Sequence, residues 1–376
     1  MKKILFIASI LLFAFFFSCS DSFEQNLELQ DSSNGFYGKV DSIVIAKMIE
    51  YNVPGLSIGL VKNDSIIYTK GYGVKRIGTD NLVSKNSIFH TASISKLFTA
   101  MAVMQLVDKE IIALNDRLIN VLPELEFSDE EAKNITIKNL LDHTSGLPDI
   151  NDYQWENNNQ SENGLKKYIL GLNLKVSSAP SSEYNYSNLG YDILGYVVEK
   201  KSGTVFEDYI KDNILDPSGM DNSDFRYFEI PDSLKTSPHS KRWITKQIYS
   251  RNTYPYTREH SPSSTLNSSS RDLGKWMVYF LRMINNESSP SMYNSMLEPS
   301  FESNSHMGLG FQLFDFKSYK AAGHFGGDKG FRSFLMIIPG KNLGLVVLGN
   351  SDYEEDYRQE IIYPIAELML TENESF

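Results

Sequence analysis

Two apolar hairpin patterns, one near each end of the chain, constrain its fold more than any other feature. The runs PGLSIGLVKND and SIIYTKGYGV meet at Asn63 and Asp64, a dipeptide suited to a tight turn between two strands. The run RSFLMIIPGKNLGLVVLGN is likewise split by Pro339 and Gly340. The sequence therefore predicts an α+β fold in which both ends of the chain contribute strands to one sheet.

The segment between the hairpins carries helical patterns and long polar loops. In residues 95–109 the apolar side chains recur every three or four positions, as on the buried face of a helix: Leu97, Met101, Met104 and Val107. Helices are also predicted in VDSIVIAKMIEY, in YDILGYVVEKKSG, which Gly203 closes, in VFEDYIKDNIL and in YRQEIIYPIAELML, where Pro364 implies a kink or a late start. The polar stretch YQWENNNQSENG is expected to be a mobile surface loop. A mostly helical subdomain is predicted over residues 116–260.

The first residues indicate a targeting segment rather than a part of the fold. Lys2 and Lys3 precede an apolar run over residues 4–17, which is shorter than the ~20 residues that span a bilayer. Cys19, the one cysteine of the chain, follows this run and resembles the lipidation site of a bacterial lipoprotein. Ser18 fits that pattern and Phe16 departs from it. The alternative is a plain exported protein in which the cysteine is incidental.

This pattern divides the chain into a signal peptide over 1–18, a lipoprotein tether over 19–38 and a folded domain over 39–376. We expect an exported bacterial lipoprotein, anchored to the membrane at Cys19 and facing the periplasm or the cell exterior. The domain holds no cysteine, so its stability must come from packing and hydrogen bonds. The net charge of -11 argues against a nucleic-acid partner.

Ser93 and Lys96 are polar residues in the otherwise apolar helical stretch HTASISKLFTA. Residues three positions apart lie on one face of a helix, so their side chains can touch. A lysine in an apolar pocket can lose its proton and accept one from a neighbouring hydroxyl. The pair is therefore a candidate nucleophile and base, although two surface residues at this spacing would look the same.

Two further motifs lie downstream. In SSEYNYSNLGYDILG, Tyr186 and Asn188 point the same way in extended backbone, where a phenol can relay a proton and an amide can orient a partner. In AAGHFGGDKGFRSF, His324 precedes Gly326 and Gly327 at the start of a strand. Glycines at a strand edge allow a ligand to approach backbone N–H groups. Taken alone, each motif also fits a buried tyrosine or a simple glycine turn.

The three motifs together, in this order, resemble those of the serine β-lactamase and penicillin-binding protein superfamily. SISK from Ser93, YSN from Tyr186 and HFG from His324 match its class C-like branch, in which His-x-Gly often replaces Lys-Thr-Gly. The stretches LLDHTSGLPD, YSNLGYDILGYVVEKKSG and YIKDNILDPSGM support the same resemblance. It extends from about Lys39 to the C-terminus.

The resemblance implies an antiparallel sheet flanked by helices, with a helical subdomain beside it and the active site between them. Ser93 would be the acylated nucleophile, and Lys96 and Tyr186 would share the roles of general base and acid in an order left open. The substrate would be bound by Asn188, His324, Gly326 and Gly327. The resemblance implies a second role for Asn188, which is to orient Lys96. The backbone N–H groups of Ser93 and Gly327 would form the oxyanion hole.

The implied activity is that of an exported serine hydrolase acting on a small molecule or peptide. The acyl donor would be a D-amino-acid peptide, an ester or a β-lactam. A histidine at position 324 weakens the fixed cation that a substrate carboxylate would meet, which makes efficient β-lactam hydrolysis less expected. The alternative is a non-catalytic binding lipoprotein on the same fold.

The other histidines are given no catalytic role. His90 and His143 are interpreted as structural residues, and His239, His260 and His306 lack the spacing of a zinc site. We therefore expect no metal and no cofactor.

Overall fold

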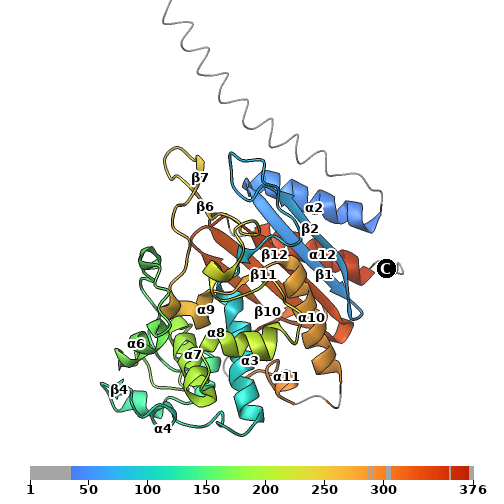
Figure 1. The fold of residues 1–376 in the computed structure, drawn as a ribbon. Helices are drawn as coiled ribbons and strands as arrows, with labels where there is room; N and C mark the ends of the chain where they lie inside the picture. The colour runs from blue at the N-terminus through green and yellow to red at the C-terminus, as the bar shows by residue number, and fades with distance from the viewer. Residues whose placement is uncertain (1–34, 287, 289–290, 302–305, 355–356, 372–376) are drawn as a thin grey trace, which may run out of the picture.

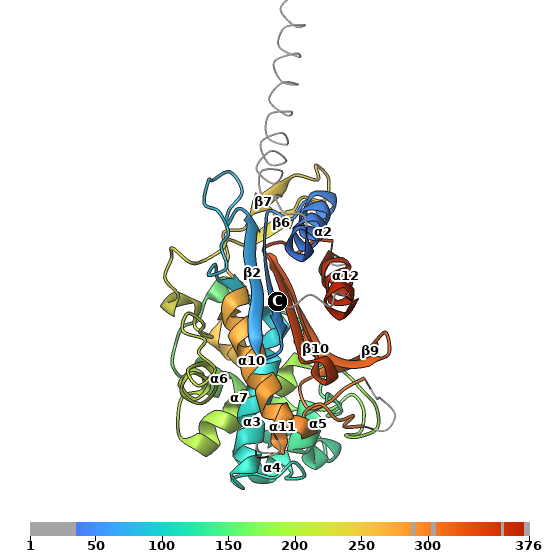
Figure 2. The same cartoon turned by 90° about the vertical axis from the view of Figure 1, so that its right-hand side faces the viewer.

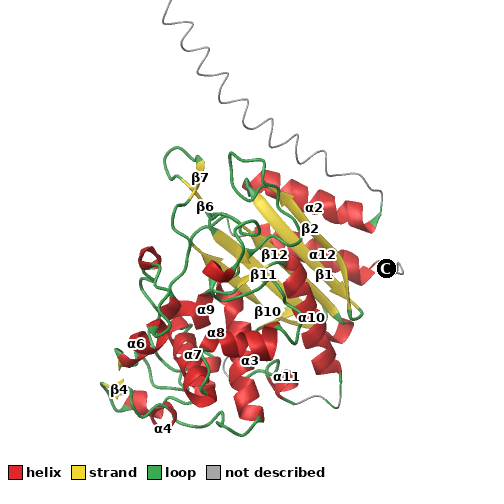
Figure 3. Ribbon diagram, viewed as in Figure 1, coloured by secondary structure: helices red, strands yellow, loops and turns green. Residues whose placement is uncertain are grey.

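The fold consists of a six-stranded antiparallel sheet with helices on both faces and a helical region beside it (Figures 1 and 3). The computed structural model describes residues 35–371, except 287, 289–290, 302–305 and 355–356. The predicted signal peptide, Cys19 and most of the predicted tether lie outside the described residues. The strands follow in the order β2 (Ser65–Gly73), β1 (Gly55–Lys62), β12 (Leu343–Gly349), β11 (Phe331–Ile338), β10 (Tyr319–Asp328) and β9 (Gln312–Phe316).

Strands from the two ends of the chain meet in the middle of this sheet. β1 pairs with β12 in a register that runs from Leu56 opposite Gly349 to Lys62 opposite Leu343. The predicted α+β class and the predicted sheet built from both chain ends are therefore confirmed.

Helices bury both faces of the sheet. α2 (Phe36–Tyr51) and α12 (Tyr357–Thr371) cover one face, and α10 (Ser270–Asn285) lies on the other (Figure 2). Successive residues of a strand point to opposite faces, and along β12 Leu345 faces α2 and α12 while Val346 faces the core around α10. A strand buried on both faces needs apolar residues at every position, which explains the unbroken apolar runs in the sequence.

The two predicted hairpins form as expected. Asn63 and Asp64 join β1 to β2 with φ values of 49° and 62°, the left-handed backbone that a two-residue hairpin turn requires. A short 3-10 turn, Pro339–Lys341, joins β11 to β12. The last helix, α12, begins at Tyr357 and continues through Pro364, so the proline does not mark a late start.

The helical region lies between the two hairpins in the sequence. α3 (Ser95–Asp108) crosses its centre and buries Leu97, Met101 and Met104, as predicted, while the fourth residue of the predicted stripe, Val107, is only partly buried. α7 (Asn188–Ser202) ends at Gly203, whose φ of 71° fits a left-handed C-terminal cap. The other helices are α4 (Leu118–Val121), α5 (Ile137–Leu141), α6 (Gly164–Leu170), α8 (Phe206–Ile210), α9 (Ser261–Ser264) and α11 (Met292–Ser295).

Three short strand pairs complete the fold. They are β3 (Phe89–His90) with β8 (Asn267–Ser268), β4 (Glu126–Phe127) with β5 (Asn173–Leu174), and β6 (His239–Lys241) with β7 (Ile248–Ser250). At the N-terminal side, α2 already begins at Phe36, inside the range predicted as tether. In the part of the chain that the structure describes, no helix combines the length and the apolar character that a membrane span requires.

Candidate active site

Ser93 lies in a single 3-10 turn between β3 and α3. Ala92, just before it, has a φ of 50°, a left-handed backbone that a residue with a side chain rarely adopts. Thr91 is fixed because its N–H and its hydroxyl both donate to the carbonyl of Leu266, at 2.8 and 2.9 Å. Ser93 is half-buried whereas its neighbours on both sides are buried. The turn therefore presents the Ser93 hydroxyl at the edge of the core.

Lys96 is fully buried on the first turn of α3, directly beside Ser93. Its Nζ donates to Ser93 Oγ at 3.1 Å, to the Ser263 carbonyl at 2.8 Å and to the side-chain oxygen of Asn188. Burial lowers the pKa of Lys96 to about 7, although nearby carboxylates, with Asp192 first among them, oppose that shift. Neutral lysine is therefore available near pH 7 to accept the Ser93 proton.

Tyr186 approaches Ser93 from the segment that precedes α7. Its hydroxyl donates to Ser93 Oγ at 3.0 Å, and Lys96 Nζ lies 5.1 Å from the centre of its ring. Burial raises the pKa of Tyr186 far above its ordinary value, so the phenol is protonated at neutral pH. The structure thus brings together the three residues that the sequence predicts as catalytic.

His143 supports Tyr186 from behind. The two rings stack with centroids 4.3 Å apart, and His143 Nδ1 accepts a hydrogen bond of 3.1 Å from the Ser187 N–H. Burial lowers the pKa of His143 well below its ordinary value, so the ring is neutral. Its backbone has a φ of 59°, in the tight turn that the stretch LLDHTSGL forms. This geometry agrees with the structural role expected for His143.

Asn188 is held on both sides of its amide. Its oxygen accepts from Lys96, and its Nδ2 donates to both carboxylate oxygens of Asp149, at 2.9 and 3.1 Å. Asp149 also accepts from the backbone N–H of Asn188 at 2.8 Å. The amide is therefore oriented with its oxygen toward the lysine, and its N–H groups are already engaged. The substrate-binding role expected for Asn188 stays a prediction.

β10 borders the site with an edge that has no strand partner in the described chain beyond Gly323, where its pairing with β9 ends. The Phe325 N–H faces this edge, since it donates to the side chain of Gln312 at 3.2 Å. Alternate residues of a strand direct their N–H groups to the same edge, so Gly327, which is exposed, presents its N–H there too. Gly326 packs so closely on the Thr91 carbonyl that a Cβ would overlap it. The Gly327 N–H therefore lies at an edge without a strand partner in the described chain, and its role in an oxyanion hole stays a prediction.

His324 is buried beside Tyr186, with ring centroids 6.3 Å apart. Its Nδ1 lies 2.6 Å from the Phe325 carbonyl, and its Nε2 has no hydrogen-bond partner among the described residues. Burial, reinforced by the charge of Lys96, lowers the pKa of His324 to about 3. The ring is therefore neutral at physiological pH and supplies no fixed positive charge, as the sequence led us to expect.

The polar loop after residue 152 closes one end of the site. Trp155 is buried, and its indole N–H donates to Asp328 Oδ1 at 2.9 Å, while His90 Nε2 lies 3.3 Å from the other oxygen. The prediction of a surface loop was wrong for Trp155, whereas most other residues of the segment are exposed as expected. The error arose because the prediction rested on the polar composition of YQWENNNQSENG and ignored its one tryptophan. The side chain of Trp155 connects this loop to Asp328 at the end of β10.

A buried carboxylate and a histidine lie behind Lys96. Asp192 Oδ2 is 2.7 Å from His260 Nδ1, and Asp192 Oδ1 accepts a hydrogen bond from the Ser263 N–H. The carbonyl of Ser263 in turn accepts a hydrogen bond from Lys96 Nζ. Sequence reasoning missed the roles of Asp149, Asp192 and His260, because their partners are distant in sequence and no spacing links them. No set of three His, Cys, Asp or Glu side chains within the described ranges is arranged to bind a metal ion.

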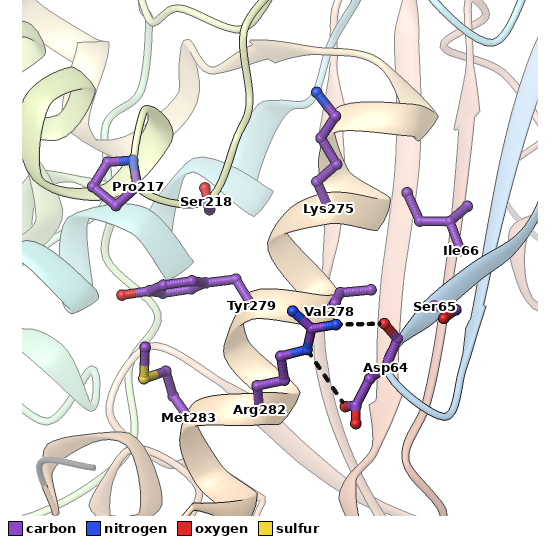
Figure 4. A pocket seen from close by; sticks show the side chains of 10 residues that line it. All are labelled: Asp64, Ser65, Ile66, Pro217, Ser218, Lys275, Val278, Tyr279, Arg282 and Met283. Atoms are coloured by element: carbon purple, nitrogen blue, oxygen red, sulfur yellow. Dashed lines mark hydrogen bonds and ion pairs between the residues drawn. The ribbon is translucent and has the colours of Figure 1, made fainter.

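A separate hollow of about 550 Å³ lies on the outer side of α10 (Figure 4). Arg282, on its rim, donates to the Asp64 carbonyl at 3.0 Å, and Lys275 is paired with Asp221 at 2.7 Å. These cations are already engaged by neighbouring groups, and none of the residues described around Ser93 lines the hollow. The candidate active site is therefore the one at the edge of β10.

The sheet built from both chain ends and the Ser-Lys-Tyr cluster at its edge define the class of protein. It belongs to the serine β-lactamase and penicillin-binding protein superfamily. The chain belongs to the Beta-lactamase family, because a sequence model of that family matches residues 40–369. The resemblance stated from the three motifs is confirmed.

Known proteins share both sequence and fold with this chain. Protein flp of Staphylococcus aureus (strain MW2) is 26% identical over 332 residues, which cover 86% of this chain and 64% of that protein. The chain thus spans less than two thirds of that relative. The octameric penicillin-binding protein homologue from Pyrococcus abyssi superposes with a TM-score of 0.75 at 25% identity, over 90% of this chain and 78% of that one. The D-amino acid amidase from Ochrobactrum anthropi SV3 superposes with a TM-score of 0.74 at 19% identity, over 89% and 98% of the two chains.

Proposed function

We propose that this protein is an exported serine hydrolase that forms an acyl-enzyme on Ser93 with amide or ester substrates. One observation carries the proposal: Ser93 Oγ lies 3.1 Å from Lys96 Nζ and 3.0 Å from the Tyr186 hydroxyl, beside a strand edge with an open N–H. A nucleophile, a base and an oxyanion donor are the parts that acyl transfer requires.

In acylation, neutral Lys96 takes the proton of Ser93 as Oγ attacks the carbonyl carbon of the substrate. We assign the first proton transfer to Lys96, since its pKa is about 7 while burial raises that of Tyr186. The N–H groups of Ser93 and Gly327 would stabilise the negative oxygen of the tetrahedral intermediate. The Tyr186 hydroxyl protonates the leaving nitrogen or oxygen, and the protonated Lys96 restores the tyrosine proton. Water then releases the acyl group by the reverse relay.

The environment of the site favours substrates that need no fixed cation near the third motif. His324 is neutral, and the half-buried Phe325, stacked on Phe334 at 3.9 Å between centroids, stands where the family motif often carries a hydroxyl. We therefore propose esters and D-amino-acid amides ahead of β-lactams and of peptides that end in a free carboxylate. The D-amino acid amidase from Ochrobactrum anthropi SV3 forms a complex with L-phenylalanine amide, an amide without a carboxylate.

The test is covalent labelling of the full chain with a fluorophosphonate, followed by intact and peptide mass spectrometry. We expect one adduct, on Ser93, that is absent from Ser93→Ala and retained in Ser161→Ala, an exposed serine distant in sequence from the motifs. Equal labelling of Ser93→Ala would refute the assignment of the nucleophile. Absence of any adduct, together with no turnover of nitrophenyl esters, would favour the non-catalytic binding protein.

Export and lipidation at Cys19 are part of the proposal and rest on the sequence of residues 1–19. We expect metabolic labelling with a radioactive fatty acid to mark the wild-type chain in a bacterial host. The Cys19→Ala variant should lose the label and appear in the soluble fraction. A labelled Cys19→Ala variant, or an unlabelled wild-type chain, would contradict the lipoprotein assignment.

A further inference from the structure

The β6–β7 hairpin displays large apolar side chains to solvent at its tip. Trp243 and Ile244 expose 83% and 82% of their surface, more than any other large apolar side chain of the described residues. Leu82, the next in that order, exposes 56%. Scattered apolar residues on a protein surface need no explanation, but an adjacent tryptophan and isoleucine that are almost fully exposed indicate a surface that another body covers.

The base of the hairpin is firmly attached to the sheet, so the tip is held in place. The His239 N–H donates to the Gly330 carbonyl, its Nδ1 lies 2.9 Å from the Asn350 carbonyl, and its own carbonyl accepts from the Asp352 N–H at 3.1 Å. Lys241 pairs with Glu354 at 3.0 Å. Trp243 is therefore exposed at the tip of a hairpin whose base is fixed to the rest of the protein.

The tip is also closed on itself. The Arg242 N–H donates to the Gln247 carbonyl at 2.9 Å, and the Lys246 N–H donates to the Arg242 carbonyl at 3.0 Å. The guanidinium of Arg242 lies 4.9 Å from the centre of the Tyr249 ring. Trp243 and Ile244 lie inside the turn that these contacts close, where both side chains are almost fully exposed.

Basic residues surround these apolar side chains, although the protein as a whole is acidic. Residues 239–251 contain no aspartate or glutamate, while the chain carries a net charge of -11. The basic residues of this segment are Lys241, Arg242, Lys246 and Arg251. Lys241 and Arg251 pair with Glu354 and Asp352 at the base of the hairpin, so the cations at the tip are Arg242 and Lys246. An aromatic and an aliphatic side chain flanked by cations match the chemistry of the headgroup layer of an anionic membrane.

The β6–β7 hairpin projects from one end of the molecule, and the first helix of the fold lies at that same end. The β6–β7 hairpin and α2, which begins at Phe36, lie at the same end in two perpendicular views (Figures 1 and 2). The loop after β2 protrudes there as well, held by a hydrogen bond of 3.0 Å from the Ile77 N–H to His239 Nε2. The sequence upstream of α2 includes the apolar run over residues 4–17.

We infer that the β6–β7 tip inserts Trp243 and Ile244 into the interfacial layer of an anionic lipid membrane. A protein partner is the less favoured occupant, because a stable protein interface buries about 800 Å² on each side. A tryptophan of up to ~250 Å² together with a smaller isoleucine falls short of that. This inference does not depend on the proposed hydrolase activity. It would orient the folded domain with the β6–β7 end toward the lipid.

The tryptophan content of the chain makes the test direct. Trp155 and Trp276 are buried, so Trp243 is the one of the three tryptophans that a soluble quencher can reach. The full chain would be reconstituted in vesicles of phosphatidylethanolamine and phosphatidylglycerol. Its fluorescence would be recorded with acrylamide in the water and, separately, with lipids brominated near the headgroup. We expect vesicles to reduce acrylamide quenching of the Trp243 emission about fivefold or more, and brominated lipid to quench it.

Two variants serve as controls. Trp243→Phe should remove the component that responds to brominated lipid while keeping the far-ultraviolet circular dichroism spectrum of the wild type, which shows that the variant is folded. Arg242→Glu combined with Lys246→Glu should reduce the quenching by brominated lipid in anionic vesicles more than in zwitterionic ones. Equal acrylamide quenching with and without vesicles would overturn the inference. Protection from acrylamide without quenching by brominated lipid would also overturn it, since it indicates a protein contact.

Discussion

Lys96 is the residue on which the proposed chemistry depends, because its neutral form must exist at the working pH. Removing its amine by Lys96→Ala should slow acylation about 100-fold or more, the usual scale for a general base. The rate of acylation by a neutral ester should rise with pH through about 7, where the buried lysine loses its proton. Stopped-flow measurement of the acyl-enzyme burst from pH 5 to 9 tests both points. A flat profile would show that another group is the base.

Asp149 is expected to act on the reaction through Asn188. Asp149→Ala frees the Nδ2 group that now donates to its carboxylate, so the amide can rotate away from Lys96. We predict a fall of about 10- to 100-fold in kcat with little change in KM. The acidic limb of the pH profile should move to lower pH, because Asp149 raises the pKa of Lys96 in the wild type.

The control for this prediction is Asp152→Ala, which removes an exposed carboxylate from the same loop. It should leave both kcat and the pH profile at their wild-type values, because Asp152 accepts only from the nearby Gln154 N–H in the described contacts. If Asp149 had only a structural role, Asp149→Ala would lower the amount of active enzyme but would not move the acidic limb of the pH profile. That outcome would contradict the positioning role.

At this scale the sequence predicted the residues that carry a motif and missed those that do not. Ser93 and Lys96 are three positions apart on one helix, so their contact follows from helical geometry. Asp149 and Asn188 are 39 positions apart in the sequence, yet they are hydrogen-bonded in the fold. Asp149 follows the tight turn at His143. Asp192 and His260 meet across two helices. Only the folded chain defines such contacts, because nothing local to either residue specifies the partner.

Among the elements, β10 has the most demanding position, because its backbone forms one wall of the site and touches the turn that carries Ser93. Gly326→Ala would drive a Cβ into the Thr91 carbonyl oxygen, and neither backbone can yield without moving the other. We expect a loss of about 1–3 kcal/mol in the free energy of unfolding, as for other overpacked positions. Urea titration followed by circular dichroism measures it.

Gly327→Ala provides the matched comparison. The added Cβ would meet only the side chain of Arg332, at 3.3 Å, and a flexible side chain can shift by that amount. Its free energy of unfolding should therefore stay within about 0.5 kcal/mol of the wild type. Equal destabilisation by the two substitutions would show that the close approach of Gly326 to Thr91 is not the reason why residue 326 must be a glycine.

The elements themselves were well predicted where their signals are local. The Asn63 and Asp64 turn and the Gly203 helix end follow from backbone preferences that each residue carries alone. The loop around Trp155 was misjudged, because the burial of its indole depends on Asp328 at the end of β10. A polar segment predicts a loop, but it does not predict whether one of its side chains has a distant partner.

Across the whole molecule, the sheet separates two apolar cores that share its strands. Ile361 on α12 is fully buried in the core on one face, while Trp276 lies in the core on the other face. Ile361→Ala should cost about 2–5 kcal/mol. Because both cores need the same strands, the melting temperature should fall equally in far-ultraviolet circular dichroism and in tryptophan fluorescence.

Glu367→Ala is the control for this experiment, since Glu367 is exposed on the same helix and forms only a surface pair with Lys317. Its melting temperature should be unchanged within about one degree, in keeping with the small contribution of surface ion pairs. If Ile361→Ala lowered the circular dichroism transition and left the fluorescence transition in place, the two cores would be independent.

The pairing of β1 with β12 also determines when this protein can acquire its structure. The sixth strand to be synthesised in the main sheet, β12, occupies a central position between β1 and β11. A nascent chain that has delivered β1 to β11 still lacks the strand that joins the two halves of the sheet. The main sheet should therefore not form until β12 has been synthesised. Late folding would suit the export that we propose, because a chain that passes through a narrow translocation channel has to be unfolded.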